Sequence, residues 1–127
     1  MQNEKVRSTR DIVERTFSFA LRIVKLCRHI EQTPGISRSL SLQLLRSGTS
    51  IGTNVEEAQA GQSRADFVSK MAIALKEARE TGYWLRLLRE SDIADSGSLD
   101  LLIKEASELS NILGAIIAKT RKVSGSY

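Results

Sequence analysis

Residues 63–92 read as one long helix that carries apolar side chains on two of its faces. At about 100° of rotation per residue, an ordinary core stripe is expected on one face. That stripe contains Phe67, Met71, Ala74, Ala78, Leu85 and Leu88. The opposite face carries Ile73, Trp84 and Leu87, with Glu77 and Glu80 between them. Leaving a large apolar side chain in water forfeits roughly 1.5 to 3 kcal/mol, so we predict that these five residues form an interface with another copy of the chain.

Glu77 and Glu80 need partners if this second face is covered, because an unpaired buried carboxylate is costly. Arg79, Arg86 or a residue of another subunit could supply the positive charge. Such pairs would fix the register of an oligomer interface. The alternative is that both carboxylates are simply exposed.

Composition sets the frame for the rest of the chain. With 127 residues the chain makes one domain, 1–127, and its 41% hydrophobic but only 5% aromatic content favours helices. Cys27 cannot form an internal disulfide and is expected to be buried in a reducing compartment. The polar amino terminus indicates no signal peptide, and no apolar run approaches the roughly 20 residues that cross a bilayer. We expect a cytoplasmic protein without membrane association.

Four helices are predicted, at about 8–32, 37–60, 63–92 and 98–122, with a flexible tail at 123–127. Thr33-Pro34-Gly35 should end the first helix, and Ser63 and Ser98 can cap the third and fourth. Four amphipathic helices with short links pack most simply as an all-α, up-down-up-down antiparallel four-helix bundle. In the first helix, the residues predicted to face inward are Ile12, Val13, Thr16, Phe19, Ala20, Ile23, Val24, Cys27 and Ile30.

Gly48 and Gly52 interrupt the second helix. Each glycine costs a helix up to about 1 kcal/mol relative to alanine. Close approach of a neighbouring backbone would explain both. A local break in the helix at 47–53 is the alternative.

Nothing in the chain resembles a catalytic or metal constellation. A di-iron bundle needs Glu-x-x-His pairs, and zinc needs several Cys or His ligands, whereas the chain has one histidine and one cysteine. The serines cluster at helix caps and no Gly-x-Ser-x-Gly turn is present. We therefore predict a non-enzymatic protein with no cofactor.

A polar stripe runs along the second helix beside its core positions. It consists of Gln43, Ser47, Ser50, Asn54 and Glu57. The favoured interpretation is a structural hydrogen-bond network across helices. A ligand-binding role is the alternative.

The net charge of +4 permits an anionic partner. The basic residues that could contact phosphates are Arg7, Arg15, Arg22, Lys25, Arg28 and His29, with Lys119, Arg121 and Lys122 near the carboxyl end. A solvated helix face is the alternative for His29 with Arg15 and Arg22, and a favourable contact with the helix carbonyl terminus is the alternative for the last three. Without exposed aromatics to stack on bases, such a surface would recognise charge and shape, and assembly would multiply its effect.

The run from Gln43 to Ala58, with Phe67, Ile73-Ala74 and Glu80 downstream, resembles a four-helix-bundle family. This family includes the S23-type proteins encoded in intervening sequences of bacterial 23S rRNA genes. Matching positions are Arg46, Ser50, Ile51, Asn54, Glu57, Phe67, Ile73, Ala74 and Glu80. Gly52 replaces the usual proline, Ala58 the glycine and Glu77 a serine, which indicates a divergent branch.

The resemblance implies a closed antiparallel bundle, assembly as a homopentamer, and no catalysis. A related accessory protein of diversity-generating retroelements binds reverse transcriptase and nucleic acid through a basic surface. The expected function is therefore an oligomeric scaffold that binds RNA or DNA. A protein-interaction adaptor without nucleic-acid binding is the alternative.

Overall fold

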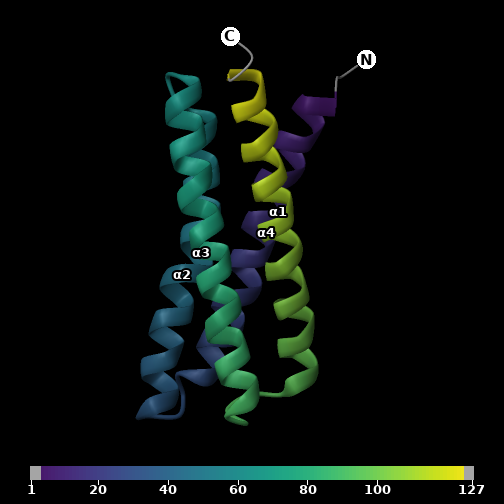
Figure 1. Ribbon diagram of the computed structural model, residues 1–127. Helices are drawn as coiled ribbons and strands as arrows, with labels where there is room; N and C mark the ends of the chain where they lie inside the picture. The colour runs from purple at the N-terminus through teal and green to yellow at the C-terminus, as the bar shows by residue number, and fades with distance from the viewer. Residues whose placement is uncertain (1–3, 125–127) are drawn as a thin grey trace.

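A computed structural model describes residues 4–124 of the chain, with side chains over 11–122. Four helices follow one another: α1 Glu4–Ile30, α2 Ile36–Gln59, α3 Arg64–Glu90 and α4 Ser96–Ser124. They run alternately up and down as an antiparallel bundle (Figure 1). The predicted all-α four-helix bundle is confirmed. None of the described helices combines the length and apolar character needed to span a membrane.

The helix ends differ from the expected positions by a few residues, and the turns explain where they fall. Gly35, with φ of 93°, adopts the left-handed conformation that favours glycine and separates α1 from α2. Ser63 caps α3 by accepting a hydrogen bond from the Asp66 amide at 3.1 Å, as the sequence predicted. α1 begins at Glu4 rather than near Ser8, and α4 continues to Ser124. The predicted flexible tail therefore overlaps the helix, and its last residues, 125–127, lie outside the described part of the chain.

The core lies along the bundle axis and receives side chains from all four helices. Phe19 and Ile23 of α1, Leu44 and Ile51 of α2, Met71 and Leu85 of α3, and Leu109 and Leu113 of α4 are almost fully buried. Val24 is 42% exposed, so its prediction as a core residue was wrong. The buried arc of α1 is narrower than the run of apolar residues, and Val24 falls on its outer edge.

Cys27 is buried, as predicted. Its thiol donates to the Ser41 carbonyl oxygen at 3.4 Å, and the Ser41 hydroxyl donates back to the Cys27 carbonyl at 3.2 Å. Burial raises the pKa of the Cys27 thiol because a thiolate is poorly solvated there. The reciprocal contact ties α1 to α2 near one end of the bundle.

The two glycines of α2 lie where α1 passes closest, and α2 is continuous through them. A Cβ placed on Gly48 would lie 2.8 Å from Ile23 Cγ2, and one on Gly52 would lie 3.3 Å from the Thr16 carbonyl oxygen. The prediction of a close neighbouring backbone is confirmed at Gly52, whereas at Gly48 the close neighbour is a side chain. The alternative of a helix break at 47–53 was wrong.

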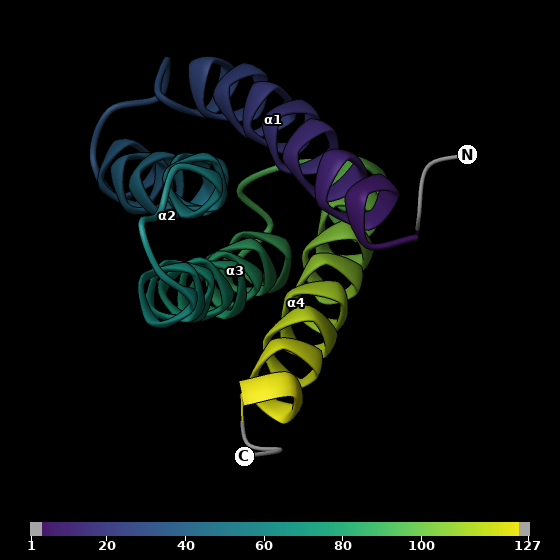
Figure 2. The same ribbon diagram turned by 90° about the horizontal axis from the view of Figure 1, so that it is seen from above.

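The seam between α1 and α4 is the most loosely packed of the four. Seen from above, α2 and α3 are viewed almost end-on, while α1 and α4 slant away from them (Figure 2). Arg15 bridges this seam, with its Nη2 atom 2.6 Å from Glu105 Oε1 and 3.3 Å from Glu108 Oε1 on α4. An ion pair therefore joins α1 and α4 along this loosely packed seam.

Candidate functional site

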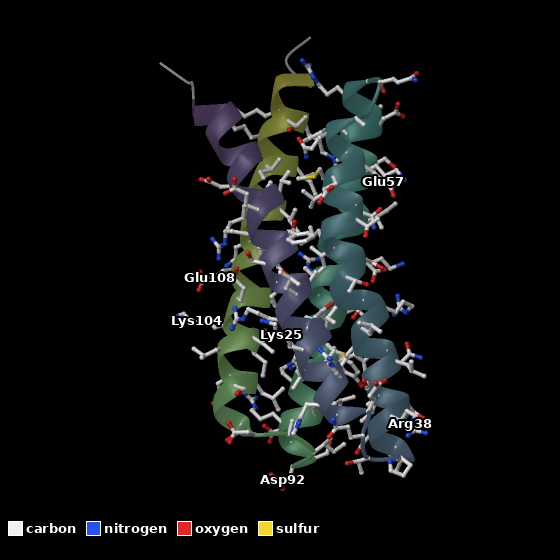
Figure 3. The ribbon with its side chains drawn as sticks, turned by 180° about the vertical axis from the view of Figure 1, so that it is seen from behind. Lys25, Arg38, Glu57, Asp92, Lys104 and Glu108 are labelled. Carbon is white, nitrogen blue, oxygen red and sulfur yellow. The ribbon has the colours of Figure 1, made fainter. Side chains whose placement is uncertain are left out.

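The carboxyl-terminal half of α1 exposes a group of basic side chains. Arg22, Lys25, Arg28 and His29 are all exposed there. Seven-residue steps place Arg22 and His29 on the side of α1 that also carries Arg15, which faces α4. Figure 3 shows Lys25 and Lys104 of α4 at a similar height on one side of the bundle. We name Arg22, Lys25, His29 and Lys104 the basic patch.

Arg15 and Arg28 do not belong to this patch. The Arg15 guanidinium donates hydrogen bonds to both oxygens of the Glu105 carboxylate. These bonds raise the pKa of Arg15 above its ordinary value. Its charge is therefore already balanced within the chain. Arg28 lies one turn beyond Lys25 and further round α1, toward the side of Val24. The side chain of Arg7 lies outside the described residues.

The remaining basic candidates lie at the opposite end of the bundle. Lys119, Arg121 and Lys122 are exposed near the carboxyl end of α4. Arg121 lines a shallow hollow together with Arg64, Ala65, Val68 and Ser69 of α3. The candidates predicted from the sequence therefore form two separate surfaces rather than one.

The second face of α3 is organised around Arg46 of α2. This guanidinium lies 3.3 Å from Glu77 Oε2 and also pairs with Glu80. The Trp84 indole N–H donates to the same Glu80 carboxylate at 3.0 Å. The prediction that an arginine pairs with these carboxylates is confirmed. The predicted residues, Arg79 and Arg86, were wrong, because the partner is Arg46. The side chains of Glu77 and Glu80 are 14% and 29% exposed, so the alternative of simple exposure was wrong as well.

The apolar members of that face differ in how far they are covered within one chain. Ile73 is 41% exposed, while Trp84 and Leu87 are half-buried. The rings of Tyr83 and Trp84 meet edge to face, with centroids 5.3 Å apart. Ile73 is thus the predicted interface residue that the monomer leaves most open.

The polar stripe of α2 is divided between two roles. Ser47 is buried and accepts a hydrogen bond from the Thr81 hydroxyl of α3 at 2.9 Å. Glu57 accepts one from Lys70 of α3 at 2.7 Å. Ser50 and Asn54 instead donate to carbonyl groups of α2 itself, at Arg46 and Ser50, and Gln43 is exposed. The predicted network across helices therefore holds at Ser47 and Glu57 only.

Sequence reasoning missed two residues of these surfaces. Arg46 was recognised as a position matching the family pattern, but its carboxylate partners lie more than 30 positions away on another helix. Lys104 carried no motif at all, and only the height of α4 relative to α1 brings it to the basic patch. Both residues can be assigned to these surfaces only when the positions of neighbouring helices are known. The periodicity of a single helix does not contain that information.

Comparison with known proteins agrees with the geometry. The chain matches the family described as 23S rRNA-intervening sequence protein over residues 8–115. It is 40% identical to a protein of unknown function from the S23 ribosomal protein family of Bacteroides thetaiotaomicron, whose crystal structure superposes with a TM-score of 0.81. The alignment covers 87% of this chain and 98% of that protein. No curated protein matches the chain. The chain therefore belongs to the 23S rRNA-intervening sequence protein family.

Proposed function

We propose that the protein is a cytoplasmic, non-enzymatic and oligomeric helical scaffold that binds RNA or other nucleic acid through the basic patch. One observation carries this proposal: among the side chains that the structure describes, none forms an ion pair with Arg22, Lys25 or Lys104. Unpaired cations on a convex helix surface attract phosphates and release counterions when they bind. The positive net charge of the chain acts in the same direction.

The patch suits a duplex or folded nucleic acid better than a single strand. Its members are Arg, Lys and His, and none of them offers a large aromatic ring on which successive bases could stack. Contacts to phosphate supply affinity without base preference. A binder of this kind would select structured RNA by the spacing of its backbone.

Reversing the charge of Arg22 and Lys25 together tests nucleic-acid binding. Arg22→Glu with Lys25→Glu is expected to weaken binding of a fluorescein-labelled RNA hairpin by about tenfold or more, and to flatten the salt dependence. Lys76→Glu with Arg79→Glu on α3 makes the same change in net charge at exposed positions with the same spacing. This control should lose much less affinity, as measured by fluorescence anisotropy over a series of salt concentrations. Equal losses, or none, would count against the patch and favour the protein-interaction adaptor.

Assembly is the second part of the proposal, and the second face of α3 is its proposed surface. The family resemblance suggests a homopentamer, and Ile73 is the open apolar position on that face. Ile73→Glu is expected to lower the particle mass in light scattering, because a carboxylate would have to be buried at the contact. Leu101→Glu, at a position 62% exposed on α4, is the matched control and should leave the mass unchanged. A wild-type mass for Ile73→Glu would contradict assembly through α3.

A further inference from the structure

A line of five residues runs along the outer side of α1, beside Lys25 of the basic patch. It consists of Glu14, Phe17, Leu21, Val24 and Arg28, spaced by three and four residues so that all lie on one side of the helix. Phe17, Leu21 and Val24 are 57%, 47% and 42% exposed, and the two charged residues are exposed as well. The line therefore has an acidic end, an apolar middle and a basic end.

α2 carries a parallel line with the same order of charge. Phe17 shares a hollow with Thr49, Thr53 and Glu56 of α2, which places Glu56 at the acidic end. Arg38 donates to the Glu31 carbonyl oxygen at 3.3 Å, which places it at the basic end. Figure 3 shows Arg38 and Glu57, the neighbour of Glu56, near opposite ends of α2.

The α2 line is apolar in the half next to Arg38, and Thr49 and Thr53 separate this part from Glu56. Leu42 is 60% exposed, and Leu45 is half-buried against the core. Together with Phe17, Leu21 and Val24 they give an apolar centre that spans both helices. We name the two lines together the α1–α2 face.

The two oppositely charged ends of the α1 line are equally far from Leu21. Glu14 lies seven residues before Leu21 and Arg28 lies seven residues after it, each about 10 Å away along the helix. We propose that the α1–α2 face binds the same face of a second copy, with a two-fold axis crossing the helices at the level of Leu21. Each α1 then runs antiparallel to the other, and Glu14 of one copy meets Arg28 of the partner subunit at both ends of the contact.

Charge selects this axis over the other two-fold arrangement of the same faces. With a two-fold axis parallel to the helices, the acidic ends of the two copies would lie at the same height. Glu14 and Glu56 of one copy would then face Glu14 and Glu56 of the partner subunit. Like charges opposed at both ends would be repulsive. Under the crossing axis, Arg38 instead meets Glu56 of the partner subunit, and Phe17 approaches Val24 across the apolar centre.

The size of the face predicts a weak contact. The α2 line from Arg38 to Glu56 is about 27 Å long, and two helices side by side are about 20 Å wide. About 500 Å² would be covered on each copy, which is at the lower end of specific interfaces. Association through this face should therefore depend on protein concentration. It goes beyond the proposed α3 contact, which involves the opposite flank of α2.

A charge-swap series tests the pairing of Glu14 with Arg28. Glu14→Arg and Arg28→Glu should each weaken the association by about tenfold or more, because each creates two repulsive pairs. The double variant Glu14→Arg/Arg28→Glu restores opposite charges and should associate like the wild type. An equimolar mixture of the two single variants should associate like the wild type for the same reason. Sedimentation equilibrium over a range of concentrations measures all four.

Matched controls separate this contact from general charge effects and from the proposed function. Asp11→Arg on α1 and Arg79→Glu on α3 make the same reversals at exposed positions outside the α1–α2 face, and both should keep the wild-type association. In an Ile73→Glu background, association through the α1–α2 face should still respond to the Glu14 and Arg28 substitutions. Failure of the proposed α3 contact can therefore be distinguished from failure of the α1–α2 contact. Single variants that associate as the wild type does, or a double variant and a mixture that both stay dissociated, would overturn the proposal.

Discussion

Replacing Gly48 with leucine is expected to lower the free energy of unfolding by at least about 3 kcal/mol. Even a Cβ at this position would lie 2.8 Å from Ile23 Cγ2 and 3.2 Å from Ile23 Cβ. Ile23 is fully buried and branched at Cβ, so it has no free rotation by which to move away. The added leucine carbons would therefore force α1 and α2 apart along the whole contact.

Alanine substitutions at two glycines distinguish the effect of helix propensity from the effect of packing against Ile23. Gly48→Ala should be mildly destabilising, because the clash outweighs a propensity gain of about 1 kcal/mol. Gly82→Ala on α3 is the matched control, because a Cβ there would meet nothing within 4 Å. That control should raise stability by about 0.5 to 1 kcal/mol.

Urea and thermal unfolding followed by circular dichroism measure these differences. For a domain of this size, Gly48→Leu should lower Tm by about 10 °C or more. Unchanged unfolding of Gly48→Leu would show that α1 and α2 do not approach each other at this point.

Local patterns in the sequence are sufficient to predict the four helices and most of the core. The apolar period of α3 and the Ser63 cap are properties of neighbouring residues, so they can be read without knowledge of the fold. Gly48 and Gly52 could be interpreted as contact positions for the same reason. Val24 could not be placed correctly, because the width of the buried arc depends on how α2 lies against α1.

Charged partners across helices were beyond local reasoning. Glu77 has Arg79 and Arg86 nearby on its own helix, yet the register between α2 and α3 selects Arg46. That register is held by the Ser47–Thr81 hydrogen bond in the core. Arg15 likewise meets carboxylates on α4, about 90 positions away, which removes it from the basic patch. Each assignment needs the pairing of whole helices.

Removing the Arg46 side chain is expected to cost about 1 to 2 kcal/mol of folding stability. Arg46→Ala leaves the Glu77 and Glu80 carboxylates one helical turn apart with no cation between them. Glu77 is 14% exposed, so water compensates it poorly. The loss stays below that of a fully buried pair because half of the Arg46 side chain is exposed to solvent.

Neutral replacements distinguish lost attraction from lost packing. Adding Glu77→Gln and Glu80→Gln to Arg46→Ala removes the repulsion while it retains side-chain shape, and most of the stability should return. Lys70→Ala, which breaks the exposed pair with Glu57, is the matched control and should cost at most about 0.5 to 1 kcal/mol.

Trp84 reports the same event by fluorescence, because it is the single tryptophan of the chain and its indole donates to Glu80. Its emission should change in Arg46→Ala and stay constant in Lys70→Ala. High salt should narrow the stability gap between Arg46→Ala and the wild type, since screening weakens the partly exposed pairs. If Arg46→Ala unfolds at the wild-type denaturant concentration with unchanged emission, Arg46 does not organise the second face of α3, and that surface depends on apolar packing alone.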